Sequence, residues 1–248
     1  MNPSDRVLLT RLFPTVLSLV AHRRRSFRAD AQAAVSRLRP PLQVLGREHI
    51  PTAGPCLLTV NHYHSPTFQA WWLSLSISAS VPADVHWIIT STLTFEDWRA
   101  NVITPLSQWA LPRVARMYDF TAMPPMPPRP FEAAARAESV RHVLRFIRDT
   151  GRPVVGLAPE GSDAPGGVLA ALPPGSGRFI QHLSAHGLTL IPIGAYESDG
   201  AFCVRFGAPY SLRVDTALPP DQRDAAAGNC VMRHIADLLP PRLRGPFV

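Results

Sequence analysis

Two short polar segments follow apolar runs of the chain, and both contain side chains that can do chemistry. The first begins with Asn61 and His62 and extends to Thr67, directly after the apolar run 56–60. A neutral imidazole at the end of a strand can take a proton from an alcohol near physiological pH, although a histidine in a loop is also commonly structural. His62 and His64 together suggest a metal pair, but no third ligand stands at a suitable spacing, so we expect no metal site.

The second polar segment, residues 159–163, reads Pro-Glu-Gly-Ser-Asp and follows the apolar run 153–157. Glycine and proline fix a tight turn in such a sequence and leave backbone N–H groups free to approach a ligand. The segment lacks the glycine spacing and the lysine of a Walker loop, and the chain has no Gly-x-Ser-x-Gly elbow of the α/β hydrolases. Taken by itself, the segment predicts either a ligand-binding turn or an ordinary structural one.

Short β-type runs alternate with longer helical windows in the rest of the chain, and these elements must position the two polar segments. The alternation predicts an α/β domain over residues 40–248, with a largely parallel sheet flanked by helices. Chemistry usually lies where the strands of such a sheet end. Five prolines in residues 121–130 predict an extended loop. The expected strands are 42–45, 56–60, 85–90, 153–157, 188–193 and 202–206, and the expected helices are 68–79, 98–115, 131–149, 177–185 and 221–239.

Residues 1–39 predict a separate, amphipathic and basic helical segment. Apolar side chains recur at helical spacing from Leu9 to Val20, and a run of arginines follows them. A helix over 7–21 is about 22 Å long against a hydrocarbon core of roughly 30 Å, so it can lie on a bilayer but cannot cross it. Residues 1–35 therefore predict either peripheral membrane contact or an amphipathic helix that packs on the core with solvated arginines.

The net charge of +7 is concentrated at the start of the chain. Residues 1–50 hold nine arginines against three acids, which leaves only +1 for the other 198 residues. This distribution argues against a nucleic-acid groove across the whole protein and favours one local anionic partner. Three widely spaced cysteines indicate neither a disulfide framework nor a zinc cluster. We expect a cytoplasmic protein that is peripheral on the inner face of the membrane and has no nucleic-acid partner.

Taken in order, these segments resemble the glycerolipid acyltransferase family, typified by the 1-acylglycerol-3-phosphate acyltransferases. That family carries Asn-His-x-x-x-x-Asp after a strand, a middle block with a basic residue, Pro-Glu-Gly-Thr/Ser-Arg, and an apolar Val-Pro-Val strand. Four motifs in the right order form a fairly specific signal, which covers roughly residues 40–215. The matching segments here are Asn61-His62, residues 109–120, residues 159–162 and residues 190–194.

The resemblance implies acyl transfer from a thioester, acyl-CoA or acyl carrier protein, to a hydroxyl of a lysophospholipid or related lipid, with no cofactor. His62 would be the general base that deprotonates the hydroxyl, without a covalent acyl-enzyme. Backbone N–H groups near either segment would stabilise the oxyanion. The implied substrate-binding residues are Asn61, Glu160, Gly161, Ser162, Asp163 and Arg116. The candidate lining of an acyl groove, for which ordinary core packing is the alternative role, is Phe68, Trp71, Trp72 and Trp109.

Thr67 stands where the family has Asp, and we pair it with His62 as the catalytic residues. A threonine hydroxyl can accept a hydrogen bond but cannot stabilise an imidazolium by charge. This matters because losing the carboxylate of a related triad costs about 10⁴ in rate. The side chains expected to support His62 are therefore His64, Glu160 or Asp163.

Two further departures concern the acceptor. Asp163 stands where the family has Arg, and a carboxylate repels phosphate. Thr121 takes the place of the basic residue that closes the middle block, with Arg116 and Arg129 near enough to substitute. We therefore predict an acyltransferase whose acceptor differs from the usual phosphomonoester.

Two other functions are compatible with the sequence. A protein that kept the fold but lost the chemistry would bind lipid or a partner, and Thr67 and Asp163 favour that hypothesis. A hydrolase with Ser65 or Ser162 as nucleophile is the third hypothesis, although neither serine has a recognised nucleophile setting.

Overall fold

The computed structural model describes residues 23–95, 97–162 and 165–247. Its strands are Gln43–Leu45 (β1), Cys56–Val60 (β2), His86–Thr90 (β3), Thr121–Met123 (β4), Val154–Leu157 (β5), Thr189–Ser198 (β6) and Ala201–Phe206 (β7). They form one sheet in the order β1-β7-β6-β2-β5-β3-β4. The five strands from β6 to β4 run parallel, whereas β7 pairs antiparallel with β6 and β1 runs alongside β7.

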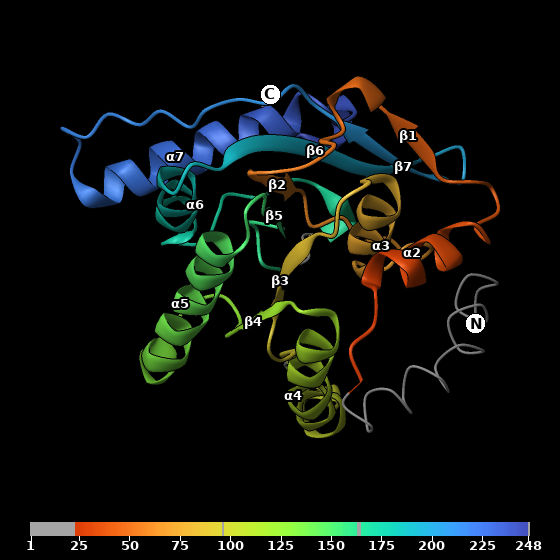
Figure 1. Ribbon diagram of the computed structural model, residues 1–248, viewed down its shortest axis with the longest axis horizontal. Helices are drawn as coiled ribbons and strands as arrows, with labels where there is room; N and C mark the ends of the chain where they lie inside the picture. Colours follow the sequence, from red (N-terminus) through yellow and green to blue (C-terminus); the bar gives the residue numbers. More distant parts are fainter. Residues whose placement is uncertain (1–22, 96, 163–164, 248) are drawn as a thin grey trace.

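Helices cover both faces of this sheet. The described α-helices are Phe27–Val35 (α2), Trp71–Ser80 (α3), Arg99–Tyr118 (α4), Ala133–Asp149 (α5), Ser176–Ala185 (α6) and Pro220–Ala236 (α7). Figure 1 shows α5, α6 and α7 on one face and α2, α3 and α4 on the other. The predicted α/β class, a largely parallel sheet flanked by helices, is confirmed.

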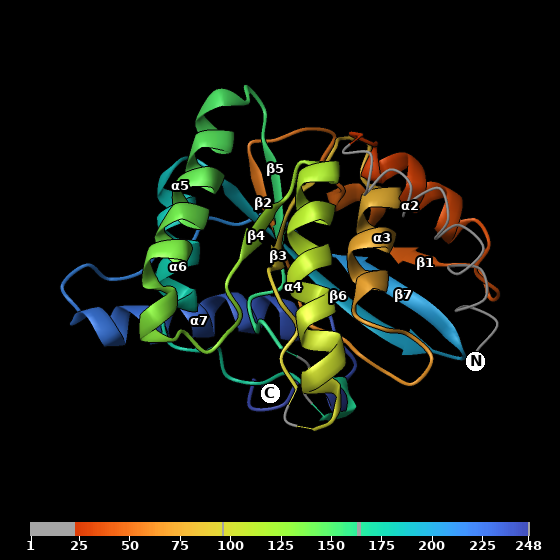
Figure 2. The same ribbon diagram turned by 90° about the horizontal axis from the view of Figure 1, so that it is seen from below.

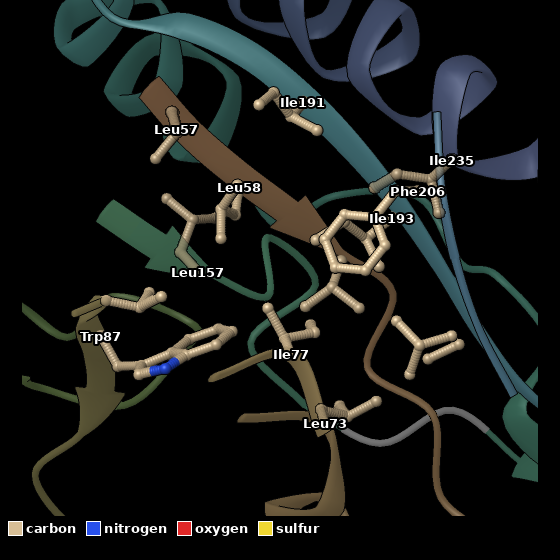
Figure 3. Packing of buried hydrophobic residues seen from close by; sticks show 14 of the residues in the cluster. Leu57, Leu58, Leu73, Ile77, Trp87, Leu157, Ile191, Ile193, Phe206 and Ile235 are labelled. Atoms are coloured by element: carbon tan, nitrogen blue, oxygen red, sulfur yellow. The ribbon is translucent and has the colours of Figure 1, made fainter. Parts of the chain in front are cut away.

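The centre of the sheet is apolar on both faces. Every residue of β2 and β5 is buried, as expected for strands covered by helices on both sides. Gly156 in β5 leaves room for the ring of Trp87, because a Cβ at this position would lie 2.7 Å from the nearest ring atom. Figure 3 shows the resulting core between the helical layers, with labelled side chains including Leu57, Leu58, Ile77, Trp87, Leu157, Ile193 and Ile235.

Two sheet elements differ from the sequence-based prediction. Residues 121–123, expected in an extended loop, form the edge strand β4, because the prolines begin only at Pro124 and leave the preceding N–H groups available to pair with β3. Strand β6 continues to Ser198 instead of ending at 193, since its second half pairs with β7 across a tight turn. The turn residues Asp199 and Gly200 both have positive φ, which suits a two-residue hairpin.

The described part of the amino-terminal segment packs on the α/β body. Ser26 caps α2, and Ala31 within that helix is fully buried against α3. Arg25 holds Asp30 through two hydrogen bonds of 2.6 and 2.8 Å, and its own N–H donates to the carbonyl of Met117 at 3.0 Å. The predicted amphipathic helix over 7–21 lies outside the described residues. None of the described helices has the length and apolar character needed to cross a bilayer.

Candidate active site

The site is built at the edge of the sheet where β2, β3, β4 and β5 end, which we call the carboxyl edge. His62 is half-buried in the loop that leaves β2 at this edge. Buried Asn61 fixes the start of the loop: its amide nitrogen donates to the carbonyl of Ala195 at 2.9 Å, and its Oδ1 accepts the Ala195 N–H at 2.7 Å. Asn61 thereby extends the hydrogen bonding between β2 and β6 by one residue beyond the end of β2. This fixes the point at which the chain leaves the sheet at His62.

Glu160 joins the two polar segments. This side chain is only 5% exposed, in the turn that leaves β5. Its Oε2 accepts the backbone N–H of His62 at 2.6 Å, and its Oε1 accepts the N–H of Ala170 at 3.0 Å. Hydrogen bonds to a carboxylate are roughly twice as strong as neutral ones. Glu160 therefore connects segments 98 residues apart in sequence and holds them together at the carboxyl edge.

Tyr63 packs the loop after β2 against the segment that follows Glu160. A Cβ on Gly167 would lie 2.6 Å from the Tyr63 ring, and Gly167 has a φ of +69°, so glycine is required there for space and for conformation. Burial, together with the nearby charge of Glu197, raises the pKa of Tyr63 above its usual value. The phenol therefore stays neutral at physiological pH and serves as a packed wall beside His62.

A carboxylate stands beside Thr67, and it comes from β6. The Thr67 hydroxyl donates to Glu197 Oε2 at 2.9 Å, and the Ser65 hydroxyl lies 3.0 Å from the same oxygen. The guanidinium of Arg242 donates to the Glu197 backbone carbonyl at 3.1 Å. Ser65 also accepts the N–H of Phe68 at 3.0 Å, which makes it part of a local turn.

Sequence reasoning did not consider Glu197, which contacts Thr67 and Ser65. Its choice of His64, Glu160 or Asp163 as the support for His62 stays a prediction. Asp163 lies outside the described residues. Glu160 directs its oxygens at two backbone N–H groups. One signal for Glu197 was present: Asp199-Gly200 between two apolar runs is a strong hairpin signature, which extends β6 past Glu197.

The exposed turn after Glu160 faces the proline-rich loop, residues 124–130. Gly161 and Ser162 are exposed, and a Cβ on Gly161 would lie 3.0 Å from the Met126 side chain. Arg136 of α5 supports that loop, because it donates to the carbonyl of Pro125 at 2.8 Å and contacts the Met126 sulfur at 3.4 Å. Partial burial lowers the pKa of Arg136 from its usual value. The loop thus separates the turn from α5.

Arg116 is not brought to this turn. It is exposed in the last turn of α4, which leads into the amino end of β4, whereas His62 follows the carboxyl end of β2. The guanidinium that the described contacts do place near the turn belongs to Arg136, through Met126. Arg129, the other candidate cation, pairs with Glu132.

The four aromatic residues considered as groove lining separate into two pairs. Phe68 and Trp72 are buried core residues, and Phe68 stacks on Phe202 with ring centroids 4.9 Å apart. Trp71 and Trp109 are exposed by 49% and 45%. The first pair therefore packs beneath the loop of His62, and the second pair lies on the surface.

Among the described residues, no group of three His, Cys, Asp or Glu side chains could hold a metal ion. The three cysteines are free thiols, and burial raises the pKa of Cys56 to about 11. These thiols are therefore protonated at physiological pH and are poor nucleophiles.

Comparison with solved structures places this arrangement on a known scaffold. The crystal structure of the 1-acyl-sn-glycerophosphate (LPA) acyltransferase PlsC from Thermotoga maritima superposes with a TM-score of 0.53, covering 86% of this chain and 78% of that one. The protein has an acyltransferase fold. The two sequences share 15% identity, so the likeness is one of fold. No known family model matches the chain, and no curated protein sequence matches it.

Proposed function

We propose that the protein transfers a fatty acyl group from acyl-CoA or acyl carrier protein to a hydroxyl of a lysophospholipid or related lipid. The observation that supports this most directly is the 2.6 Å hydrogen bond from the His62 N–H to Glu160. It joins the histidine segment to the Pro-Glu-Gly-Ser segment at one edge of an acyltransferase fold. Two short motifs that are weak signals separately thereby become parts of one site.

In the proposed reaction, His62 takes the proton of the acceptor hydroxyl as its oxygen attacks the thioester carbonyl carbon. The new C–O bond gives a tetrahedral oxyanion, which backbone N–H groups of the exposed turn stabilise. Collapse of this intermediate breaks the C–S bond, and the leaving thiolate takes the proton from the imidazolium. No acyl-enzyme forms and no cofactor is consumed.

Thr67 and Glu197 have a positioning role in this proposal. Their contact ties the far end of the loop to β6, while Asn61 and Glu160 hold the near end. Glu197 also brings a negative charge to the loop, which Thr67 itself lacks. The predicted acceptor-binding residues of the turn remain Gly161, Ser162 and Asp163, next to Asn61 and Glu160, and Arg136, which contacts Met126 beside the turn, takes the place of Arg116.

The test is thiol release from long-chain acyl-CoA by the full chain, with a panel of lysolipids and neutral alcohols as acceptors. His62→Ala is expected to abolish acceptor-dependent release, because it removes the base. His182→Ala is the matched control, since His182 is exposed on α6, and it should release thiol at the wild-type rate.

Equal release by wild type and His62→Ala would refute the proposed mechanism. No release from acyl-CoA or acyl carrier protein with any acceptor would favour a lipid-binding protein that retains the acyltransferase fold. Release of free fatty acid that depends on Ser65 or Ser162 would identify a hydrolase.

A further inference from the structure

Exposed apolar side chains are concentrated on one side of the described molecule. Among the described residues, eight large apolar side chains are at least 40% exposed, and seven of them belong to α4, to the first turn of α3 or to connections that leave the carboxyl edge. The eighth is Leu45, on the outermost strand at the other end of the sheet. The seven are Trp71, Leu93, Trp98, Val102, Leu106, Trp109 and Phe131.

Four of these residues form a stripe on α4 and the residue that precedes it. Trp98, Val102, Leu106 and Trp109 recur at spacings of four, four and three, which places them on one side of a helix. Their exposed fractions are 70%, 60%, 59% and 45%, whereas Ser107 on the opposite side is buried. In Figure 2, α4 lies in front of the sheet, on the side from which the molecule is seen. We call this stripe the α4 face.

The other three residues surround the carboxyl edge. Trp71 begins α3, which follows the loop of His62, and Leu93 lies in the connection that leaves β3. Phe131, 79% exposed, follows the proline-rich loop that leaves β4. All three connections start at the same edge because β2, β3 and β4 are parallel. This apolar rim therefore continues the α4 face to the edge that carries His62.

Arginines cover aromatic rings along this surface. The guanidinium carbons lie 4.5 to 4.9 Å from the ring centroids, within the range of cation–π contacts. Such a pair presents a cation at the level of lipid phosphates and a ring at the level of the acyl chains. In the ranges that the structure describes, all three such pairs lie here: Arg99 with Phe95, Arg113 with Trp109, and Arg129 with Phe131. Arg99 and Arg129 also form ion pairs with Asp97 and Glu132, so Arg113 contributes most of the net positive charge of the three.

The first described residues, Arg23 to Arg25, lie beside the carboxyl end of α4. The Arg25 N–H donates to Met117 in the last turn of α4, and Arg24 is 82% exposed next to Asp119. Arg24 and Arg25 form ion pairs with Asp119 and Asp30, so Arg23 and Arg116 supply the net positive charge at the carboxyl end of the same helix. Positive charge next to tryptophan and aliphatic side chains fits a surface that carries negative charge above an apolar interior.

We propose that the α4 face and the apolar rim dock on a bilayer that contains anionic phospholipid. Docking would turn the loop of His62 toward the lipid surface, so that an acceptor enters the site without crossing water. The choice of a lipid occupant rests partly on the proposed function, but the docking surface stands on exposure, spacing and charge.

Vesicle flotation of the full chain tests this proposal without any substrate. The double substitution Val102→Glu and Leu106→Glu, which we call the glutamate variant, places two negative charges on the α4 face, where both side chains are more than half exposed. We expect this variant to bind mixed phosphatidylcholine and phosphatidylglycerol vesicles at least about tenfold more weakly than wild type. Leu45→Glu is the matched control and should float like wild type; far-ultraviolet circular dichroism verifies that both variants are folded.

Fluorescence quenching by lipids with brominated acyl chains locates the contact. Quenching of tryptophan emission on vesicle binding should fall in Trp98→Phe combined with Trp109→Phe, because these rings would enter the acyl region. Unchanged flotation of the glutamate variant would overturn the proposal and assign binding to residues 1–22. A lipid-free dimer of wild type that the glutamate variant lacks would overturn it in favour of a second copy of the chain.

A separate measurement distinguishes this proposal from the proposed function. With a water-soluble, short-chain acceptor below its micellar concentration, the glutamate variant should retain wild-type thiol release. With the same acceptor class in vesicles, it should lose most of that release. Wild-type flotation through the α4 face without any acyl transfer would refute the function and support the docking surface.

Discussion

The loop after β2 is held at its two ends by contacts of different kinds. At the near end, Asn61 and Glu160 are buried and bind backbone groups of other segments. At the far end, the exposed hydroxyl of Thr67 binds the side chain of Glu197. The near-end residues belong to the motifs on which the sequence-based resemblance rests, and they hold the architecture of the loop. The far end departs from that pattern, and a carboxylate from a distant strand stands beside the departure.

We therefore expect substitutions at the near end to lower mainly stability, and substitutions at the far end to lower mainly activity. Loss of a buried contact exposes backbone polar groups to an apolar interior, so its main cost is stability. Loss of an exposed side-chain contact costs little stability, because water replaces it. Activity is the more sensitive measure at the far end.

Glu160→Ala is expected to have the largest effect on stability. Both N–H groups that the carboxylate accepts lose their partner, and each such bond contributes about 1.5–3 kcal/mol, so the free energy of unfolding should fall by about 3 kcal/mol or more. Urea unfolding followed by circular dichroism measures this change. Glu138→Ala, at an exposed glutamate of α5, is the control with an expected change within about 0.5 kcal/mol. Equal losses in the two variants would mean that Glu160 does not hold the segments together.

A pH titration tests the histidine that is buried inside the sheet. His86 is 3% exposed, lies 2.8 Å from the Thr121 hydroxyl and stacks on Phe146, and burial lowers its pKa to about 4. An unfolded chain takes up this proton near pH 6.5, whereas the folded chain does so only near pH 4. Stability should therefore be lost as the pH falls through this window, by at most about 3 kcal/mol.

His86→Gln tests the origin of that pH dependence. The variant is expected to be less stable than wild type at pH 7, because it disturbs the stacking, but its stability should change less between pH 7 and pH 4.5. Denaturant unfolding at both pH values provides the comparison. A pH dependence equal to that of wild type would assign the effect to other groups.

Glu197→Gln is expected to have the smallest effect on stability and a clear effect on activity. The amide keeps the size of the side chain but removes its charge, so unfolding should change by less than about 1 kcal/mol. Acyl transfer should fall on the order of tenfold, as for other contacts that orient a reacting group. Thr67→Val should cause a similar loss, and the double variant should lose little more than either one, because both substitutions weaken the same contact. Additive losses would show that the two residues act separately.

The sequence by itself determined most of the elements, but not β4 or the full length of β6, and it determined the strand ends at which the candidate site residues lie. Apolar runs of strand length at 56–60 and 153–157 predict buried strands, and the polar segments after them predict the places of His62 and Glu160. These features are local, because the period of apolar side chains and the residues of a turn act over a few positions. The α/β class followed from the same alternation.

Only the tertiary structure decided which side chains meet. Glu160 and His62 are 98 residues apart, and Glu197 and Thr67 are 130 apart, so each contact depends on strand order and register. The antiparallel β7, which lets β6 extend to Glu197, is such a non-local fact. Local patterns carry no information about which strand lies beside which, because the free energy of that choice comes from packing across the whole sheet.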